Sequence, residues 1–271
     1  MRHFLTALVL GLALPALNLP AFAQESPLVA LRTGDDSKGW NAVGRLDLGN
    51  FGFCTGTLIE PKLVLTAAHC LFDKATGARI DPRDIKFLAG LRFGRAEAYR
   101  GVTRAVPHPD YVYSGADSLD RVAFDVALLE LDQPIRQPSI IPFETDARPA
   151  KGDEVGVISY AKDRSEAPSL QQVCHVIDEA PDVLVLSCDV DFGSSGAPIF
   201  AVVEGEPRIV SVVSAKAEID GQKVALGTAL EAPLLVLMAE MAKAEGTDTT
   251  FGGTVHTLMG RRANGAKFVK P

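Results

Sequence analysis

Residues 63–70 read LVLTAAHC, an apolar run that breaks into small residues just before a histidine. The leucines and the β-branched valine are typical of a buried strand. The change to Thr66 and two alanines sets the imidazole of His69 at the strand end. Because neutral imidazole exchanges a proton near pH 7, His69 is a candidate acid–base group. Taken alone, a histidine in such a motif is more often structural than catalytic.

A second apolar run, DVALLEL at residues 125–131, begins with an acid. Asp125 opens an otherwise apolar strand, so we expect its carboxylate to be partly buried. A buried carboxylate is unfavourable unless it is paired, and a histidine N–H is a suitable partner. A turn aspartate before a strand is the alternative for this motif alone.

A third segment, DFGSSGAP at residues 191–198, is rich in small residues around Ser195. Small neighbours let a reacting carbonyl approach closely, and Gly193 can turn its backbone N–H toward the same point. The N–H groups of Gly193 and Ser195 would form a hole for an oxyanion, which is often worth ~3–4 kcal/mol. A Gly/Ser turn without chemistry is the alternative.

The remaining pattern is mostly that of strands, with helical periodicity clear only at residues 232–244. Four prolines in residues 132–150 argue against a strand there, and we predict a crossing between two halves. Elsewhere short β-branched runs alternate with Gly, Pro and Asp clusters, which is typical of an antiparallel barrel or sandwich. We predict strands at residues 40–48, 54–66, 85–91, 98–106, 125–131, 153–160, 169–177, 182–188, 197–203, 207–214 and 224–230.

The composition excludes several classes of protein. The chain has 271 residues, 47% hydrophobic and 23% charged, enough for one large domain or two small ones and unlike a disordered, collagen or coiled-coil chain. With 27 Lys+Arg against 34 Asp+Glu, the net charge of -7 provides no positive field for a polyanion. We therefore expect neither nucleic acid nor an anionic membrane surface as a partner.

The N-terminus has the layout of a secretory signal peptide, and we predict cleavage after Ala23. Arg2 precedes an apolar run at residues 4–17, and the small-x-small triplet AFA precedes Gln24. The run of about 14 residues is shorter than the ~20 that a spanning helix needs, which argues against an uncleaved membrane anchor. We expect an exported protein, in the periplasm or the medium, where disulfides form and persist.

Together the three motifs resemble the signatures of the trypsin-like, chymotrypsin-fold serine protease family. LTAAHC around His69, DVALLEL at Asp125 and GSSGAP around Ser195 follow the family's chain order, and VPHPDY at 106–111 resembles the segment before its aspartate strand. The resemblance covers residues 40–244. It implies an all-β fold of two six-stranded antiparallel β-barrels with a C-terminal helix, in which the three residues meet in the cleft between barrels.

The resemblance implies a secreted serine endopeptidase that acts on polypeptides without a metal or organic cofactor, and we expect a monomer. Ser195 attacks the scissile carbonyl to form an acyl-enzyme, and His69 acts as base and then as acid. Asp125 fixes the imidazole tautomer and stabilises the imidazolium. Gly193 and Ser195 supply the oxyanion hole.

The resemblance also implies two disulfides and a division of the chain. Cys54 and Cys70 bracket the segment leading to His69, as a disulfide does in many family members, and we pair Cys174 with Cys188. Closing such loops typically contributes ~3 kcal/mol. The expected divisions are a signal peptide (1–23), an N-terminal segment or short propeptide (24–39), the first barrel (40–135), the second barrel with the helix (136–246) and a tail of no assigned role (247–271).

Activation and specificity depart from the common family pattern. Many members pair a freed hydrophobic N-terminus with an aspartate just before the nucleophile, but here that residue is Ser194. The pattern is more similar to secreted bacterial members, including glutamyl endopeptidases. Asp189 stands where trypsin-like enzymes bind Arg or Lys, but Cys-Asp also resembles a glutamyl endopeptidase segment, so both interpretations stay open. Ser211 and Val213 are expected to line the backbone track that holds substrate by β-augmentation.

Other classes fit the sequence less well. An α/β-hydrolase needs G-x-S-x-G and the order Ser, Asp, His, whereas here Ala197 replaces the second glycine and the order is His, Asp, Ser. A protease with an added PDZ domain needs more than the 76 residues that follow Ser195. The alternative that remains is a catalytically silent, trypsin-like binding protein.

Overall fold

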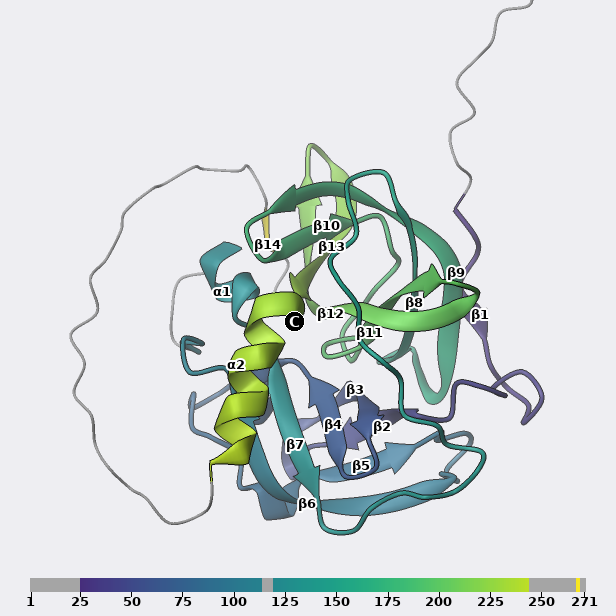
Figure 1. The fold of residues 1–271 in the computed structure, drawn as a ribbon, viewed down its shortest axis with the longest axis vertical. Helices are drawn as coiled ribbons and strands as arrows, with labels where there is room; N and C mark the ends of the chain where they lie inside the picture. The colour runs from purple at the N-terminus through teal and green to yellow at the C-terminus, as the bar shows by residue number, and fades with distance from the viewer. Residues whose placement is uncertain (1–24, 114–118, 244–266, 269–271) are drawn as a thin grey trace, which may run out of the picture.

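A computed structural model describes residues 25–113, 119–243 and 267–268 of the chain, and strands dominate it (Figure 1). The predicted signal peptide, residues 1–23, lies outside the described residues, as does most of the predicted tail. No helix in the described ranges is long and apolar enough to cross a membrane.

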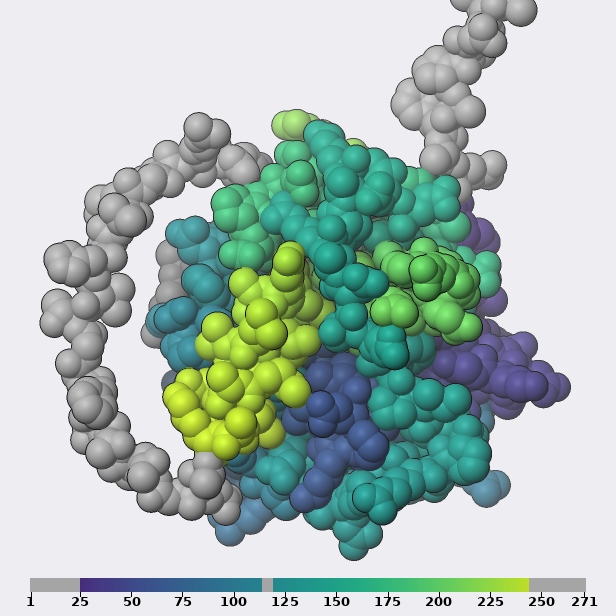
Figure 2. All heavy atoms as spheres, viewed as in Figure 1, coloured from purple at the N-terminus to yellow at the C-terminus, as the bar shows by residue number. Residues whose placement is uncertain are grey.

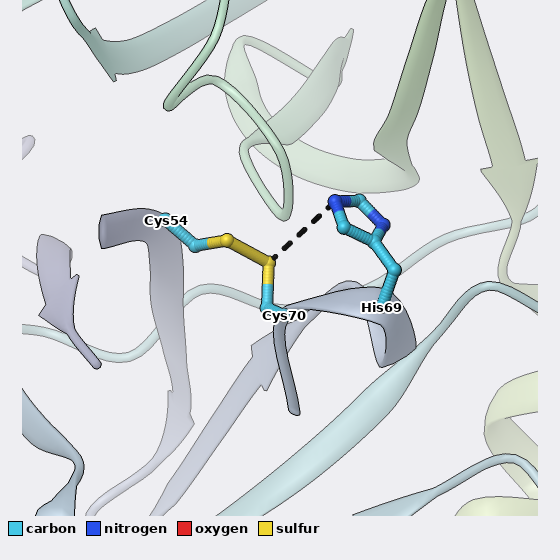
Figure 3. Close-up of side chains that lie close together, drawn as sticks. All are labelled: Cys54, His69 and Cys70. Carbon is cyan, nitrogen blue, oxygen red and sulfur yellow. Dashed lines mark hydrogen bonds between the residues drawn. A yellow bond between two sulfur atoms is a disulfide. The ribbon is translucent and has the colours of Figure 1, made fainter. Parts of the chain in front are cut away.

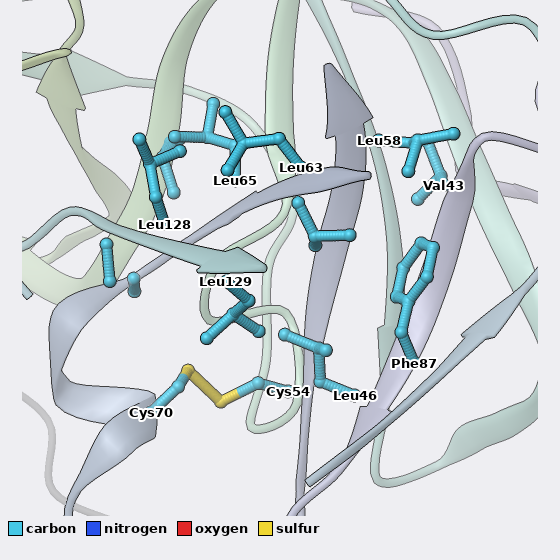
Figure 4. Packing of buried hydrophobic residues seen from close by; sticks show 14 of the residues in the cluster. Val43, Leu46, Cys54, Leu58, Leu63, Leu65, Cys70, Phe87, Leu128 and Leu129 are labelled. Carbon is cyan, nitrogen blue, oxygen red and sulfur yellow. A yellow bond between two sulfur atoms is a disulfide. The ribbon is translucent and has the colours of Figure 1, made fainter. Parts of the chain in front are cut away.

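The first half of the chain forms a closed six-stranded antiparallel barrel in the order β2-β3-β4-β7-β6-β5. Leu46, Leu129 and the Cys54–Cys70 disulfide point into one buried interior (Figure 4). The single run predicted at 54–66 is two strands, because the chain turns at residues 61–62. The strands are β2 (Val43–Asp47), β3 (Phe53–Glu60), β4 (Leu63–Thr66), β5 (Lys86–Ala89), β6 (Ala98–Pro107) and β7 (Ala127–Leu131).

The second half forms a sheet whose six central strands run β8-β9-β10-β13-β12-β11, and the pairing of β11 with β8 closes the ring. Two short strands join it at its edges, β1 (Val29–Ala30) on β9 and β14 (Lys267–Phe268) on β12. The central strands are β8 (Glu154–Ala161), β9 (Arg164–Ala180), β10 (Val183–Leu186), β11 (Pro198–Val203), β12 (Glu206–Ile219) and β13 (Gln222–Ala229). The expected fold of two six-stranded barrels is confirmed.

The proline-rich segment between β7 and β8 crosses from one barrel to the other without forming a strand. Each proline lacks an N–H and fixes φ, which explains why this segment does not join a ladder. An isolated bridge at Thr145 ties it to Ile209 of β12.

The C-terminal helix α2 (Glu231–Ala242) follows the second barrel and returns to pack against β6 and β7 of the first. It lies on the surface along the first-barrel residues (Figure 2). Arg104 of β6 holds its end, donating to the carbonyl oxygens of Glu240 at 2.7 Å and Met241 at 2.9 Å. A cation there also complements the helix dipole. The other helices are α1 (Leu119–Ala123) and the 3₁₀ turns η1 (Gly49–Phe51), η2 (Ala68–Leu71) and η3 (Pro82–Asp84).

We predict that Arg104→Met lowers the free energy of unfolding by about 1–2 kcal/mol, because it removes charged hydrogen bonds to the helix end but keeps the apolar stem. Arg95→Met is the matched control, since the Arg95 side chain is exposed. Denaturant unfolding measures both changes. Equal stability of the two variants would contradict this role of Arg104.

Candidate active site

His69 lies on the 3₁₀ turn η2, directly after β4 ends at Thr66. Ala67 and Ala68 are fully buried, and their small side chains let the chain turn tightly between the two barrels. The His69 side chain keeps 16% of its surface exposed. The imidazole is therefore fixed on one side and accessible on the other.

The carboxylate of Asp125 is buried beside His69 and accepts three hydrogen bonds. It receives the His69 backbone N–H at 2.8 Å, the His69 ring through Nδ1 at 2.6 Å and the Ser214 hydroxyl at 2.5 Å. The side chain is only 2% exposed, so these donors offset the cost of burying its charge. Because the carboxylate accepts at Nδ1, the neutral ring carries its proton there and leaves Nε2 as an acceptor.

Asp125 does not open the strand, as the sequence suggested, but precedes β7 by two residues. Its backbone N–H donates to Val122 of α1, a helix that the sequence pattern did not predict. The Thr228 hydroxyl of β13 donates to Val122 at 2.5 Å, so the second barrel holds the turn that presents Asp125.

Ser195 lies in the loop 191–197, which the first barrel holds through its backbone. Thr55 of β3 donates its N–H to the Ser195 carbonyl at 2.8 Å and its hydroxyl to the Gly193 carbonyl at 2.9 Å. Gly196 has a φ of +78°, and a Cβ there would lie 2.1 Å from Thr66 Oγ1. Only glycine can occupy position 196, because the backbone there lies too close to Thr66 for a side chain. This close contact places the loop against the end of β4, near His69.

The N–H groups of Gly193 and Ser195 donate to no atom of the described chain, and neither does the Ser195 hydroxyl. The structure shows no hydrogen bond between Ser195 and His69 within the described residues. Instead, His69 Nε2 lies 3.9 Å from Cys70 Sγ (Figure 3).

Two disulfides join the expected cysteines, Cys54 with Cys70 and Cys174 with Cys188. The first ties β3 to the turn that carries His69. Cys54, His69 and Cys70 bring potential metal-ligand atoms within 4.8 Å of one another, but both sulfurs belong to the disulfide. Because metals bind thiolates, this cluster does not fit a metal ion while the disulfide is intact.

The predicted substrate-binding residues differ in their exposure. Asp189 is exposed, and its backbone N–H donates to Gln171. Ser211 is buried and donates its hydroxyl to Thr228 at 2.8 Å. Val213 is also buried, and its N–H and carbonyl bond to Ala197 and Gly196. Neither the Ser211 nor the Val213 side chain faces an open surface, and their role in substrate binding stays a prediction.

The residues that follow Val213 were missed by the sequence analysis. Ser214 bonds to the buried carboxylate of Asp125, and its position in the strand RIVSVVS was the only available signal. Lys216 reaches back to the loop, where Nζ lies 2.5 Å from Asp191 Oδ1 and 4.1 Å from the centre of the Phe192 ring. Its hydrogen bond lowers the pKa of Asp191.

Ser194, the residue just before the candidate nucleophile, is fully buried behind the loop. Its hydroxyl donates to Ser159 Oγ at 3.0 Å, and the guanidinium of Arg164 donates to the same Ser159 oxygen at 3.2 Å. Burial lowers the pKa of Arg164. The loop is therefore held from behind by internal hydrogen bonds in this structure.

We predict that Gly196→Ala costs at least about 2 kcal/mol more in unfolding free energy than Gly205→Ala. Both glycines have a positive φ, +78° and +86°, but a Cβ at 205 meets nothing within 4 Å. The control therefore carries the conformational strain without the clash against Thr66. Equal losses in denaturant unfolding would show that the loop does not press against β4.

Comparisons with known proteins agree with this geometry. The model of the trypsin-like peptidase domain matches residues 54–208, which include the positions of His69, Asp125 and Ser195. Serine protease 23 from Mus musculus is 28% identical over 172 residues, 57% of this chain and 44% of that protein. The Serine protease 23 from Homo sapiens is 27% identical over 164 residues, which make up 54% of this chain and 42% of that protein. The match thus spans less than half of either mammalian protein.

A solved structure of a Glu endopeptidase in complex with MPD has a TM-score of 0.61 to this chain at 19% identity. The superposition covers 75% of this chain and 92% of the Glu endopeptidase chain. The two proteins therefore share a fold. The family match extends over more than half of the sequence and contains both the buried Asp125–His69 pair and the loop that carries Ser195. The chain therefore belongs to the trypsin-like peptidase family.

Proposed function

We propose that the protein is an exported serine endopeptidase in which Ser195, His69 and Asp125 form the catalytic triad. The observation that carries the proposal is the buried carboxylate of Asp125, which holds the Nδ1 side of His69 at 2.6 Å. This contact leaves Nε2 free to take a proton. The unpaired N–H groups of Gly193 and Ser195 support the second requirement, an oxyanion hole.

In the proposed reaction, Nε2 of His69 takes the proton of the Ser195 hydroxyl as Oγ forms a bond to the scissile carbonyl carbon. The carbonyl electron pair moves onto oxygen, where the N–H groups of Gly193 and Ser195 stabilise it. The intermediate collapses, the C–N bond breaks, and His69 gives its proton to the leaving amine. Water then attacks the acyl-enzyme with His69 again as base, and the acid product leaves.

Asp125 contributes by orientation and charge. Its two oxygens bind the ring and the backbone of the same residue, His69, so the imidazole is held at two points. The negative charge stabilises the imidazolium that forms when Nε2 takes the proton. The hydrogen bond between Nε2 and Ser195 forms when substrate binds, as catalytic contacts often tighten only in the substrate complex.

The cellular setting and domain organisation follow the same proposal. The two disulfides support an oxidising compartment, and we propose export after removal of residues 1–23. We propose that residues 40–135 and 136–246 are the two functional halves of a monomer that acts on polypeptides. Asp189 is exposed near the loop and stays a candidate to bind a basic substrate residue.

A catalytically silent, trypsin-like binding protein is the second candidate. It is favoured by one observation, the lack of a hydrogen bond from His69 to Ser195 in the described structure. Under this alternative the cleft binds a polypeptide but does not cleave it, and a reagent directed at active serines does not react.

The test is labelling of the purified, disulfide-intact protein with a serine-directed phosphonate, located by intact mass and peptide mapping. We expect one label per chain at Ser195, because the triad activates that hydroxyl alone. Labelling should disappear in His69→Ala and Ser195→Ala and persist in Ser139→Ala, a control at an exposed serine. The reagent is irreversible, so it also traps a site that opens only transiently. A folded protein that stays unlabelled after prolonged exposure would favour the binding protein.

A further inference from the structure

Residues 191–194 form a tight turn whose central peptide carries one donor of the proposed oxyanion hole. Ser194 donates its N–H to the Asp191 carbonyl at 2.8 Å, which closes the turn. Gly193, the third residue, has a φ of +101°, and a positive φ at this position is that of a type II turn. The central peptide joins Phe192 to Gly193, so it holds the Gly193 N–H that the proposed reaction uses.

The direction of the Gly193 N–H depends on which way this peptide faces. Turns of types I and II differ by a rotation of the central peptide, since ψ of the second residue and φ of the third both change by roughly 150–170°. Here the N–H of Lys162 donates to the Phe192 carbonyl at 2.7 Å. In a trans peptide the C=O and the N–H point in opposite directions, so the Gly193 N–H points away from Lys162. A rotated peptide would break this bond and withdraw the N–H from the proposed hole.

The side chain of Lys216 contacts both residues that precede Gly193. Its Nζ lies 2.5 Å from Asp191 Oδ1 and 4.1 Å from the centre of the Phe192 ring. The same Asp191 oxygen accepts the Phe192 N–H at 2.8 Å. Because a cation at this distance is attracted to the face of a ring, one ammonium group holds the start of the turn through a carboxylate and an aromatic side chain.

Lys216 belongs to β12, a strand that also supports the acid of the proposed triad. Two residues earlier, Ser214 donates its hydroxyl to Asp125. Lys216 itself pairs with Ala225 of β13, so its backbone is fixed inside the sheet. The ammonium group therefore reaches the turn from an element whose position is already set.

We propose that Lys216 is a positioning residue that keeps the Gly193 N–H directed into the oxyanion hole. This inference rests on the proposed peptidase function and adds a residue that the triad does not include. The side chains of Lys216 and Asp191 are 27% and 45% exposed, so their ion pair is weak on its own. A tenfold preference for one orientation of the peptide corresponds to only about 1.4 kcal/mol, and the ion pair and the ring contact act on the same peptide.

The test measures phosphonate labelling of Ser195 at a series of reagent concentrations, which separates the maximal rate from the concentration that gives half of it. As Oγ bonds to phosphorus, the phosphonyl oxygen gains negative charge, so the maximal rate depends on the oxyanion donors. We expect Lys216→Met to lower the maximal rate about tenfold and to leave the half-saturating concentration unchanged. Loss of a donor outright would cost about 10²–10³.

Further variants test the contact itself. Lys216→Arg keeps the cation and should stay within about twofold of the unsubstituted protein. Asp191→Asn keeps an oxygen for the Phe192 N–H but removes the charge, and it should lose as much as Lys216→Met. The double variant should lose no more than either single one, since both act through one contact. Lys223→Met, at an exposed lysine of β13, is the matched control and should label at the unchanged rate.

The outcomes separate this inference from the proposed function, once unfolding free energies show that every variant is folded. Equal maximal rates in Lys216→Met and the unsubstituted protein would overturn the inference and leave the peptidase in place. A change confined to the half-saturating concentration would also overturn it, because Lys216 would then bind the reagent. An equal loss in Lys216→Arg would overturn the role of the charge. No labelling of the unsubstituted protein would overturn the proposed function and the inference with it.

Discussion

The site depends on one buried carboxylate that joins the two barrels. Asp125 belongs to the first barrel, and it accepts hydrogen bonds from His69 of the same barrel and from Ser214 of the second. Removing such a group from water is costly, and the three donors offset that cost only when both barrels are docked. The orientation of the imidazole is therefore linked to the docking of the barrels.

A second set of contacts sets the position of the nucleophile loop. Thr55 of the first barrel bonds to the carbonyl oxygens of Gly193 and Ser195, and Gly196 approaches the end of β4. These contacts use carbonyl groups and leave the N–H groups of Gly193 and Ser195 unpaired. The acceptors of the loop thus bind the scaffold while these two donors have no partner in the described chain, as the proposed oxyanion hole requires.

The sequence predicted the fold class and most strands because their apolar runs are short and bounded by Gly, Pro and Asp. It placed His69 at the end of a buried strand for the same reason. The sequence did not predict the contact of Ser214 with Asp125, because the alternation along RIVSVVS does not say which serine faces Asp125. Which serine does so depends on the irregular pairing of β12 with β13. The short strands β1 and β14 were missed because long-range pairing, and not local pattern, creates them.

The most direct test of the central claim is NMR of the protein with ¹⁵N-labelled histidine. If the buried carboxylate of Asp125 fixes the tautomer, the spectrum of the protein with a neutral His69 ring shows a slowly exchanging proton on Nδ1 of His69. That proton should be lost in Asp125→Asn while the fold persists. A His69 ring protonated at Nε2, or an Nδ1 proton unchanged in Asp125→Asn, would contradict the account.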